Sequence, residues 1–147
     1  MLNSIEAIAS MESWDLLMDF IENQSNQNLQ DSKQAYGMRL AGEEILSNMI
    51  REIHESTETL ESHLIWITSQ IFLLGNKAWF EIVIEDNGPQ FDPHLEMPRD
   101  IQALTPVNER PIGGLGLFLV QQSVDQANYE WANNRNRYQL RVAKQST

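Results

Sequence analysis

Apolar residues near the start of the chain repeat with the period of an α-helix. The spacing i, i+3, i+4 and i+7 predicts a helix over residues 10–23 with one apolar face, formed by Trp14, Leu17, Met18 and Ile21. The run NQSNQNLQDS that follows, residues 23–32, is almost entirely polar. Such a run is typical of a connection, so we expect a loop there.

A second helix is predicted from an N-cap at Ser32 to about residue 54. One broad face of this helix is apolar and consists of Met38, Ile45, Leu46, Met49, Ile50 and Ile53. Because each residue turns the helix by about 100°, the opposite side brings together Gly37, Ala41, Glu44 and Asn48.

From residue 63 onward the apolar period changes to two, which is typical of β-strands. Residues 64–73 and 78–86 are two such runs, and the short connection LGNK between them predicts a hairpin. On the second strand Asp86 shares the face of Phe80, Ile82 and Ile84. This apolar face must enter the core, so Asp86 is expected to point inward, where an unpaired carboxylate is unfavourable.

All five prolines lie between positions 89 and 111, which predicts a long irregular loop of the kind that forms a lid, a binding loop or a disordered segment. IGGLGL then opens a third predicted helix that reaches about residue 127. A last hairpin is predicted from residues 129–132 and 137–144, and a weak edge strand from residues 2–8. This order predicts an α+β fold, a two-layer α/β sandwich with three helices on one face of a mostly antiparallel sheet.

Composition narrows the possible functions. A chain of 147 residues with 41% hydrophobic residues is typical of one globular domain, which we expect to span residues 1–147. The formal charge of -11 argues against non-specific binding to nucleic acid or to anionic membranes, because both require a basic face. The absence of cysteine excludes disulfides, thiolate metal sites and cysteine nucleophiles.

The sequence predicts neither secretion nor membrane insertion. The start MLNSIEAIAS lacks the basic and apolar regions of a signal peptide. The most apolar stretch, residues 65–74, is far shorter than the roughly 20 apolar residues of a membrane-spanning helix. We therefore expect a soluble, cytoplasmic protein.

The first group of residues that could carry chemistry is the pair Glu44 and Asn48, one turn apart on the second predicted helix. A solvated helix face is the plain explanation for such a pair. Gly37 and Ala41 on the same side leave room for another group to approach. A glycine inside a helix costs about 1 kcal/mol relative to alanine, so its presence there calls for an explanation.

The second and third groups are the segment EDNGPQFDP, which contains Asp86, and the segment IGGLGL. An inward-facing carboxylate must accept hydrogen bonds, and the exocyclic amine of a nucleobase is a suitable donor. Glycines at a helix N-terminus expose backbone N–H groups and so form an anion site suited to phosphates. A P-loop is excluded because its lysine is missing, and a dinucleotide-binding fold fits poorly.

In this order, EEILSN, a strand ending in EDNG, a long loop and GGLGL resemble the Bergerat ATP-binding fold of the GHKL superfamily. The segments RLAGEEILSNMI, EDNGPQFDP, ERPIGGLGLFLV and NRNRYQLRVAK are similar to one branch of it, the anti-sigma-factor serine/threonine kinases. Proteins of that branch phosphorylate STAS-domain anti-anti-sigma proteins. The resemblance covers nearly the whole chain.

The resemblance implies a role for each matching residue. Asn48 would hold Mg²⁺ through its side-chain oxygen, and Glu44 would orient or deprotonate the attacking hydroxyl. Asp86 would accept a hydrogen bond from the adenine amine, and Gly88 would let the base approach. The backbone of the second glycine motif would meet the phosphates beneath an ATP lid at about residues 93–112. The implied nucleotide-binding set is Asn48, Asp86, Gly88, Phe91, Arg110, Gly113, Gly114, Leu115 and Gly116.

The chain departs from the branch at three places. Glu52 stands four residues after the Mg²⁺ asparagine, where the branch often has histidine. Pro111 and Ile112 separate Arg110 from the second glycine motif, whereas some members carry an arginine directly beside it. The last hairpin has Asn-Arg where many members have Gly-Thr.

The resemblance therefore implies an anti-sigma regulatory protein that uses ATP and Mg²⁺ to phosphorylate a serine or threonine of a STAS-domain partner. It also implies a homodimer that sequesters a second partner, expected to be a sigma factor. The alternative is a partner-switching module that binds nucleotide without phosphotransfer.

A histidine-kinase catalytic domain would need a phosphoacceptor histidine on a dimerising helical hairpin, and a metal-dependent hydrolase would need a ligand cluster. We predict neither, and expect His54, His63 and His94 to be surface or packing residues.

Overall fold

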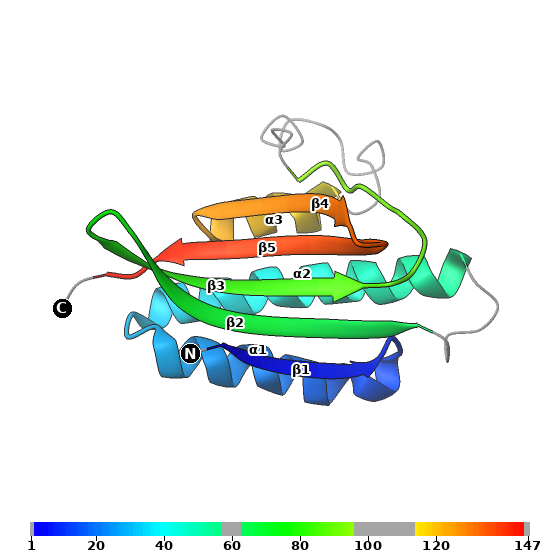
Figure 1. Ribbon diagram of the computed structural model, residues 1–147, viewed down its shortest axis with the longest axis horizontal. Coiled ribbons are helices and arrows are strands. Elements are labelled where there is room, and N and C mark those ends of the chain that lie inside the picture. Colours follow the sequence, from blue (N-terminus) through cyan, green and yellow to red (C-terminus); the bar gives the residue numbers. More distant parts are fainter. Residues whose placement is uncertain (1, 57–62, 96–113, 146–147) are drawn as a thin grey trace.

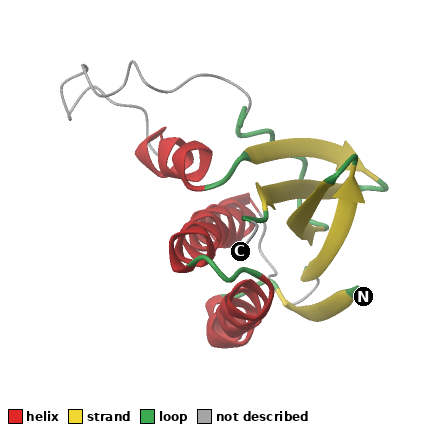
Figure 2. Cartoon of the chain, turned by 90° about the vertical axis from the view of Figure 1, so that its left-hand side faces the viewer, coloured by secondary structure: helices red, strands yellow, loops and turns green. Residues whose placement is uncertain are grey.

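The computed structural model describes residues 2–56, 63–95 and 114–145. A layer of helices lies against a layer of strands (Figures 1 and 2). In chain order the elements are β1 (Asn3–Ile8), the short 3₁₀ helix η1 (Met11–Ser13), α1 (Trp14–Asn28), α2 (Ser32–Ser56), β2 (Leu64–Leu74), β3 (Lys77–Asp86), α3 (Gly114–Ser123), β4 (Gln126–Ala132) and β5 (Arg135–Ala143).

The strands form one sheet in the order β1-β2-β3-β5-β4, and every pairing in it is antiparallel. Figure 2 shows α1, α2 and α3 side by side on the same face of this sheet. The predicted α+β two-layer sandwich is confirmed. The predicted edge strand is also present as β1, which pairs with β2.

Helix α1 is longer than predicted, so the prediction of a loop at residues 23–32 is wrong for its first part. The helix continues to Asn28 because the inward positions still repeat, with the small residue Ser25 buried below Ile21. The polar side chain of Gln24 is satisfied by tertiary hydrogen bonds, since its Oε1 accepts from Asn3 Nδ2 at 3.0 Å and from Ser69 Oγ at 2.6 Å. These contacts offset the weak helix propensity of the stretch.

The N-cap of α2 is Asp31 and not Ser32 as predicted. The Asp31 carboxylate accepts hydrogen bonds from the backbone N–H groups of Lys33 at 2.8 Å and Gln34 at 3.3 Å. Aspartate and serine both cap helices well, so sequence alone did not separate two adjacent candidates.

Helix α3 ends at Ser123, earlier than the predicted residue 127. The residues after Ser123 join the sheet and do not continue the helix. Asp125 N–H donates to the Arg141 carbonyl, and the Asp125 carboxylate accepts from Ala143 N–H. The last hairpin is correspondingly longer than predicted and turns at Asn133 and Asn134, whose φ angles are 55° and 61°. Two consecutive positive φ angles are the requirement of a type I′ hairpin turn, and asparagine tolerates them.

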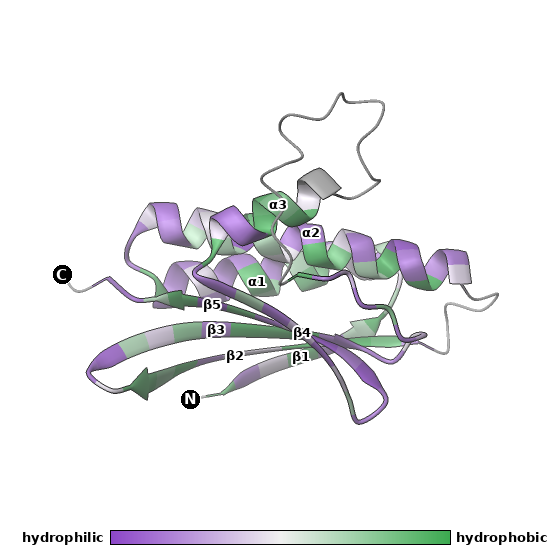
Figure 3. Ribbon diagram, turned by 90° about the horizontal axis from the view of Figure 1, so that it is seen from above, coloured by the Kyte–Doolittle hydropathy of each residue, from purple (hydrophilic) through white to green (hydrophobic). Residues whose placement is uncertain are grey.

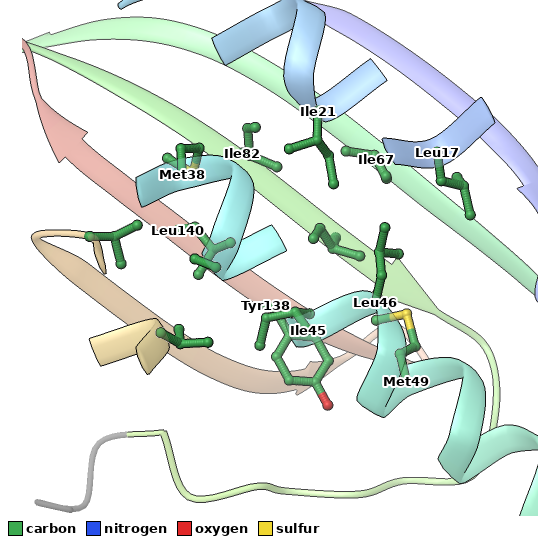
Figure 4. Packing of buried hydrophobic residues seen from close by; sticks show 14 of the residues in the cluster. Leu17, Ile21, Met38, Ile45, Leu46, Met49, Ile67, Ile82, Tyr138 and Leu140 are labelled. Atoms are coloured by element: carbon green, nitrogen blue, oxygen red, sulfur yellow. The ribbon is translucent and has the colours of Figure 1, made fainter. Parts of the chain in front are cut away.

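The core lies between the two layers. Figure 4 shows α2 side chains such as Met38 and Ile45 in one cluster with Ile82 of β3 and Leu140 of β5. The hydropathy colouring in Figure 3 alternates between hydrophilic and hydrophobic bands along α1 and α2, as expected of helices with one buried face. Helix α2 therefore has a fixed orientation, with its apolar face held by the sheet, and this orientation determines where its polar residues lie.

The side of α2 that carries small residues packs against α3. A Cβ atom on Gly37 would overlap the backbone carbonyl of Ser123 at the end of α3, and one on Gly116 would overlap the Glu44 carboxylate. Gly37 and Ala41 are both buried. The room that these small residues leave is therefore used by α3 and not by a ligand.

The other face of the sheet is covered by its own side chains. Arg141 donates to Glu81 at 2.7 Å and lies over the ring of Phe72, while Glu81 also accepts from Gln70. These contacts explain how Glu81 is only 3% exposed on a sheet face without helices.

In the part of the chain that the structure describes, no helix combines the length and the apolar character that crossing a membrane requires.

The contact between Gly37 and Ser123 gives a stability prediction. Gly37→Ala should lower the free energy of unfolding by about 1–3 kcal/mol, because the added methyl group meets rigid backbone and forces α2 and α3 apart. This loss should outweigh the helix-propensity gain of about 1 kcal/mol. Urea denaturation measures it.

Gly42→Ala is the matched control, because the nearest atoms to its added Cβ would belong to the Ile21 side chain, with Cδ1 at 2.9 Å, and not to rigid backbone. The control should be clearly less damaging. An equal or larger loss in Gly42→Ala would contradict this account of how α3 packs on α2.

Candidate functional site

Asp86 ends β3 with its carboxylate inside the molecule, as predicted, and the residue is only 3% exposed. Its Oδ1 atom accepts hydrogen bonds from Gly88 N–H at 2.8 Å and from the Asn136 side-chain amide at 3.0 Å. The carboxylate is therefore fixed in one orientation by the chain around it.

Asn136 is the centre of this hydrogen-bond network, and sequence reasoning missed it. It is 2% exposed, and its Nδ2 donates to the Pro89 carbonyl at 2.9 Å as well as to Asp86. Its Oδ1 accepts from Phe91 N–H at 2.9 Å and from the Tyr129 hydroxyl at 2.6 Å. All of its usual donors and acceptors are in use, so Asn136 is a scaffold residue.

A signal for Asn136 was present in the sequence. It alternates with Tyr138, Leu140 and Val142 on β5, so it had to face inward with them. The register of β5 against β3 could not be predicted from this alternation. It is this register, which pairs Asp86 with Asn136, that places the two side chains together.

Burial is the main influence on the pKa values of Asp86 and Tyr138. Removal from water raises the pKa of Asp86, while the hydrogen bonds from Asn136 and Gly88 and the charge of His63 oppose this effect. The pKa of the Tyr138 hydroxyl is also raised, first by burial and then by the Asp86 carboxylate. The pocket is thus rich in acceptors and negative charge, which favours a neutral ligand group that donates hydrogen bonds over a phosphate.

A cavity of about 70 Å³ adjoins Asp86. Its lining residues come from the second half of α2, the end of β3, the loop after it and β5, and they are Met49, Glu52, Ile53, Ser56, Asp86, Pro89, Gln90, Phe91, Asn136 and Tyr138. The predicted site residues Asp86 and Phe91 therefore lie in one cavity, between apolar α2 side chains and the polar network.

Gly88 lies beside this cavity, and the structure gives a packing reason for it. A Cβ atom there would be 2.7 Å from Ile53 Cγ1 and 3.1 Å from Asp86 Oδ1. Only glycine lets the loop close over Ile53 while donating its N–H to Asp86.

Glu44 and Asn48 lie on earlier turns of the same helix, outside the Asp86 cavity. The Glu44 carboxylate sits against Gly116 in the first turn of α3, where the helix dipole favours a negative charge. The Asn48 Oδ1 atom accepts a hydrogen bond from the Arg51 guanidinium at 2.7 Å. The atom expected to bind Mg²⁺ is therefore turned toward a cation.

Glu44 also borders a second and larger space. This groove of about 550 Å³ runs along α2 beside η1 and the start of α1, and it is lined by Met11, Trp14, Glu43, Glu44, Ser47, Ile50, Arg51 and His54. Glu44 therefore stands between the first turn of α3 and an open, mostly apolar groove.

Asn48 is a chemically suitable partner for Mg²⁺, because this hard cation prefers oxygen ligands and usually takes few from the protein and the rest from phosphates and water. Across residues 2–56, 63–95 and 114–145, no group of three or more His, Cys, Asp or Glu side chains could hold a metal alone. The donor set thus fits a metal that arrives with a polyphosphate.

The predicted second glycine motif and lid lie only partly within the described residues. Arg110, Gly113 and the predicted lid beyond residue 95 lie outside the described residues. Gly114 and Leu115 are the first residues of α3, so the glycine motif does open a helix as predicted.

Comparison with known families gives an independent result. The model of the family described as histidine kinase-like ATPase domain matches residues 9–144, which is nearly the whole chain. A search of curated proteins found no match.

The buried carboxylate makes a pH prediction. Because the pKa of Asp86 is raised in the folded protein, the folded state holds this proton more tightly than the unfolded chain does. The contribution of Asp86 to stability should therefore decrease as pH rises from about 4 toward neutrality.

The measurement is urea denaturation of wild type and Asp86→Asn across that pH range, since the asparagine variant removes only this titration. The free energy of unfolding of wild type minus that of the variant should fall steadily with rising pH. A constant or rising difference would show that burial does not dominate at Asp86.

Proposed function

The chain belongs to the histidine kinase-like ATPase domain family, and we propose that it binds ATP with Mg²⁺ and transfers the γ-phosphoryl group to a serine or threonine of a STAS-domain partner. The observation that carries the proposal is the buried Asp86 carboxylate. Its orientation is fixed by Asn136 and Gly88, and among the described residues nothing donates a hydrogen bond to its other oxygen, which can recognise a ligand.

At the base end, the second Asp86 oxygen accepts a hydrogen bond from the adenine amino group. Met49 and Ile53 supply an apolar wall for the ring. The cavity of about 70 Å³ holds only part of a nucleotide, so the ligand extends from it toward the earlier turns of α2.

At the phosphate end, Asn48 contributes its side-chain oxygen to Mg²⁺, which supplies charge neutralisation for the triphosphate when bound. Arg51 must first release that oxygen, and as an exposed side chain it can turn away at little cost. The backbone N–H groups at Gly114 and Gly116 in the first turn of α3 provide donors for phosphate oxygens.

Glu44 serves the transfer step. The serine Oγ forms a bond to the γ-phosphorus while the bond to the β,γ-bridging oxygen breaks, and the hydroxyl proton passes to the Glu44 carboxylate as ADP is released. The position of Glu44 supports this role, because it borders both the start of α3 and the groove lined by Met11 and Trp14. A segment of the partner entering that groove would bring its hydroxyl to Glu44.

The second candidate is a partner-switching module that binds nucleotide and performs no transfer. The contact between Glu44 and Gly116 favours it, since a carboxylate placed at a helix N-terminus also has a purely structural explanation. A sigma factor as sequestered partner and a homodimer are expectations of both candidates.

The base-end assignment predicts a binding defect. Asp86→Asn should weaken Mg²⁺-ATP binding about 5- to 150-fold, because an amide cannot both keep its contacts to Gly88 and Asn136 and present a second acceptor. Isothermal titration measures the affinity. Asp92→Asn, an exposed change on the following loop, is the control and should bind normally. Unchanged binding in Asp86→Asn would contradict adenine recognition by Asp86.

The transfer step predicts a defect of another kind. Glu44→Gln keeps the shape of the side chain and removes its basicity, so ATP should bind about as well while transfer falls about 10²–10⁴-fold. The assay follows the label of [γ-³²P]ATP to a purified STAS-domain protein from the same genome. Glu22→Gln, an exposed change on α1 that does not line the groove, is the control and should retain transfer.

The same assay separates the two candidates. Absence of label on the STAS protein, together with nucleotide-dependent binding of that protein, would contradict the kinase and support the module.

A further inference from the structure

The Asp86 cavity contains a second carboxylate, Glu52, that the function proposed above does not use. Glu52 is half-buried and lies on the last turns of α2, on the cavity side. Its negative charge reaches the buried Tyr138 hydroxyl and contributes to the raised pKa of that group. Among the described residues, Glu52 forms neither an ion pair nor a hydrogen bond through its side chain.

The charged groups of the cavity offer only acceptors, whereas Ser56, Gln90 and the Tyr138 hydroxyl in the same lining can also donate. Asn136 is fully engaged with protein partners, and Asp86 Oδ1 already accepts two hydrogen bonds. Of the charged acceptors, the second Asp86 oxygen and the Glu52 carboxylate remain, and an ionised carboxylate can only accept. A ligand that satisfies both must carry donors at two separate points.

Helix α2 sets the distance between these points. Asn48 and Glu52 are one turn apart, about 6 Å along the helix axis. Ile53, the next residue, packs against Gly88 beside Asp86. A nucleotide whose base meets Asp86 and whose triphosphate meets Asn48 must therefore carry its ribose along the part of α2 that presents Glu52.

The chemistry of the ribose suits this neighbour. Its 2′- and 3′-hydroxyls are hydrogen-bond donors, and a carboxylate that accepts from a ribose hydroxyl is an established mode of recognition in dinucleotide-binding folds. A phosphate at the same place would be repelled by the charge of Glu52.

We propose that Glu52 accepts hydrogen bonds from the vicinal ribose hydroxyls and makes the site selective for ribonucleotides over nucleotides that lack them. The inference rests on the proposed binding of ATP. It assigns a specificity role to the position where the similar kinases often carry histidine.

The experiment compares ATP with 2′,3′-dideoxy-ATP by isothermal titration in Mg²⁺. Wild type should prefer ATP by about 10- to 100-fold, the range expected when a donor to a charged acceptor is removed. Glu52→Ala should bind the two nucleotides with nearly equal affinity, and Glu52→Gln should retain part of the preference. Glu55→Ala, an exposed carboxylate on the same helix end, should keep the full preference.

A second pair of probes separates ribose recognition from metal binding. Adenosine and 2′,3′-dideoxyadenosine in EDTA contain neither phosphate nor Mg²⁺, so the preference of wild type and its loss in Glu52→Ala should persist with them. A preference that disappears in EDTA would instead assign Glu52 to the metal and overturn the proposal.

The remaining outcomes are also decisive. Equal binding of ATP and its dideoxy analogue by wild type, or a full preference in Glu52→Ala, would overturn the role of Glu52 while leaving ATP binding intact. Failure of wild type to bind ATP at all would overturn the proposed function, and this inference with it.

Discussion

The hydrogen bond between Asn136 and Asp86 is the interaction on which the candidate site depends. A carboxylate that is only 3% exposed is strongly unfavourable unless its oxygens are paired, and Asn136 and Gly88 pair one of them. The same asparagine holds the loop after β3 through Phe91 N–H and the Pro89 carbonyl. One buried amide thus stabilises the charge, shapes the cavity and keeps the second oxygen of Asp86 available.

Helix α2 determines how the rest of the site is arranged around that bond. Its apolar face is held by the sheet, so Glu44, Asn48 and Glu52 are presented at intervals of one turn along its length. The small residue Gly37 lets α3 pack closely on the same helix, which brings Gly116 to Glu44. The proposed base end and the proposed phosphate end are therefore connected by one rigid element, and the helical repeat sets the distance that a ligand must span between them.

The sequence predicted the parts of this arrangement that follow from local periodicity. Alternation along β3 was sufficient to place Asp86 inward, and the glycines of IGGLGL correctly marked the start of α3. The prediction failed where tertiary contacts decide, as at residues 23–28, where Gln24 finds partners on β1 and β2 that make a polar stretch helical. Asn136 was missed for a related reason, since its role depends on the register of β5 against β3.

The two ends of the site are built differently, and this difference bears on what each can do. Asp86 is fixed by buried hydrogen bonds within the sheet and its loop, so the proposed base end is formed without a ligand. Asn48 is held only by the exposed Arg51, and Glu44 by its place against α3 beside an open groove. A preformed end suits selective binding, because few side chains have to be ordered when the ligand binds and the entropy cost of binding is therefore small. An adjustable end open to a groove suits the proposed transfer step, which needs a metal, a phosphate and a second protein together. Under this proposal recognition and chemistry take place at separate points along one helix.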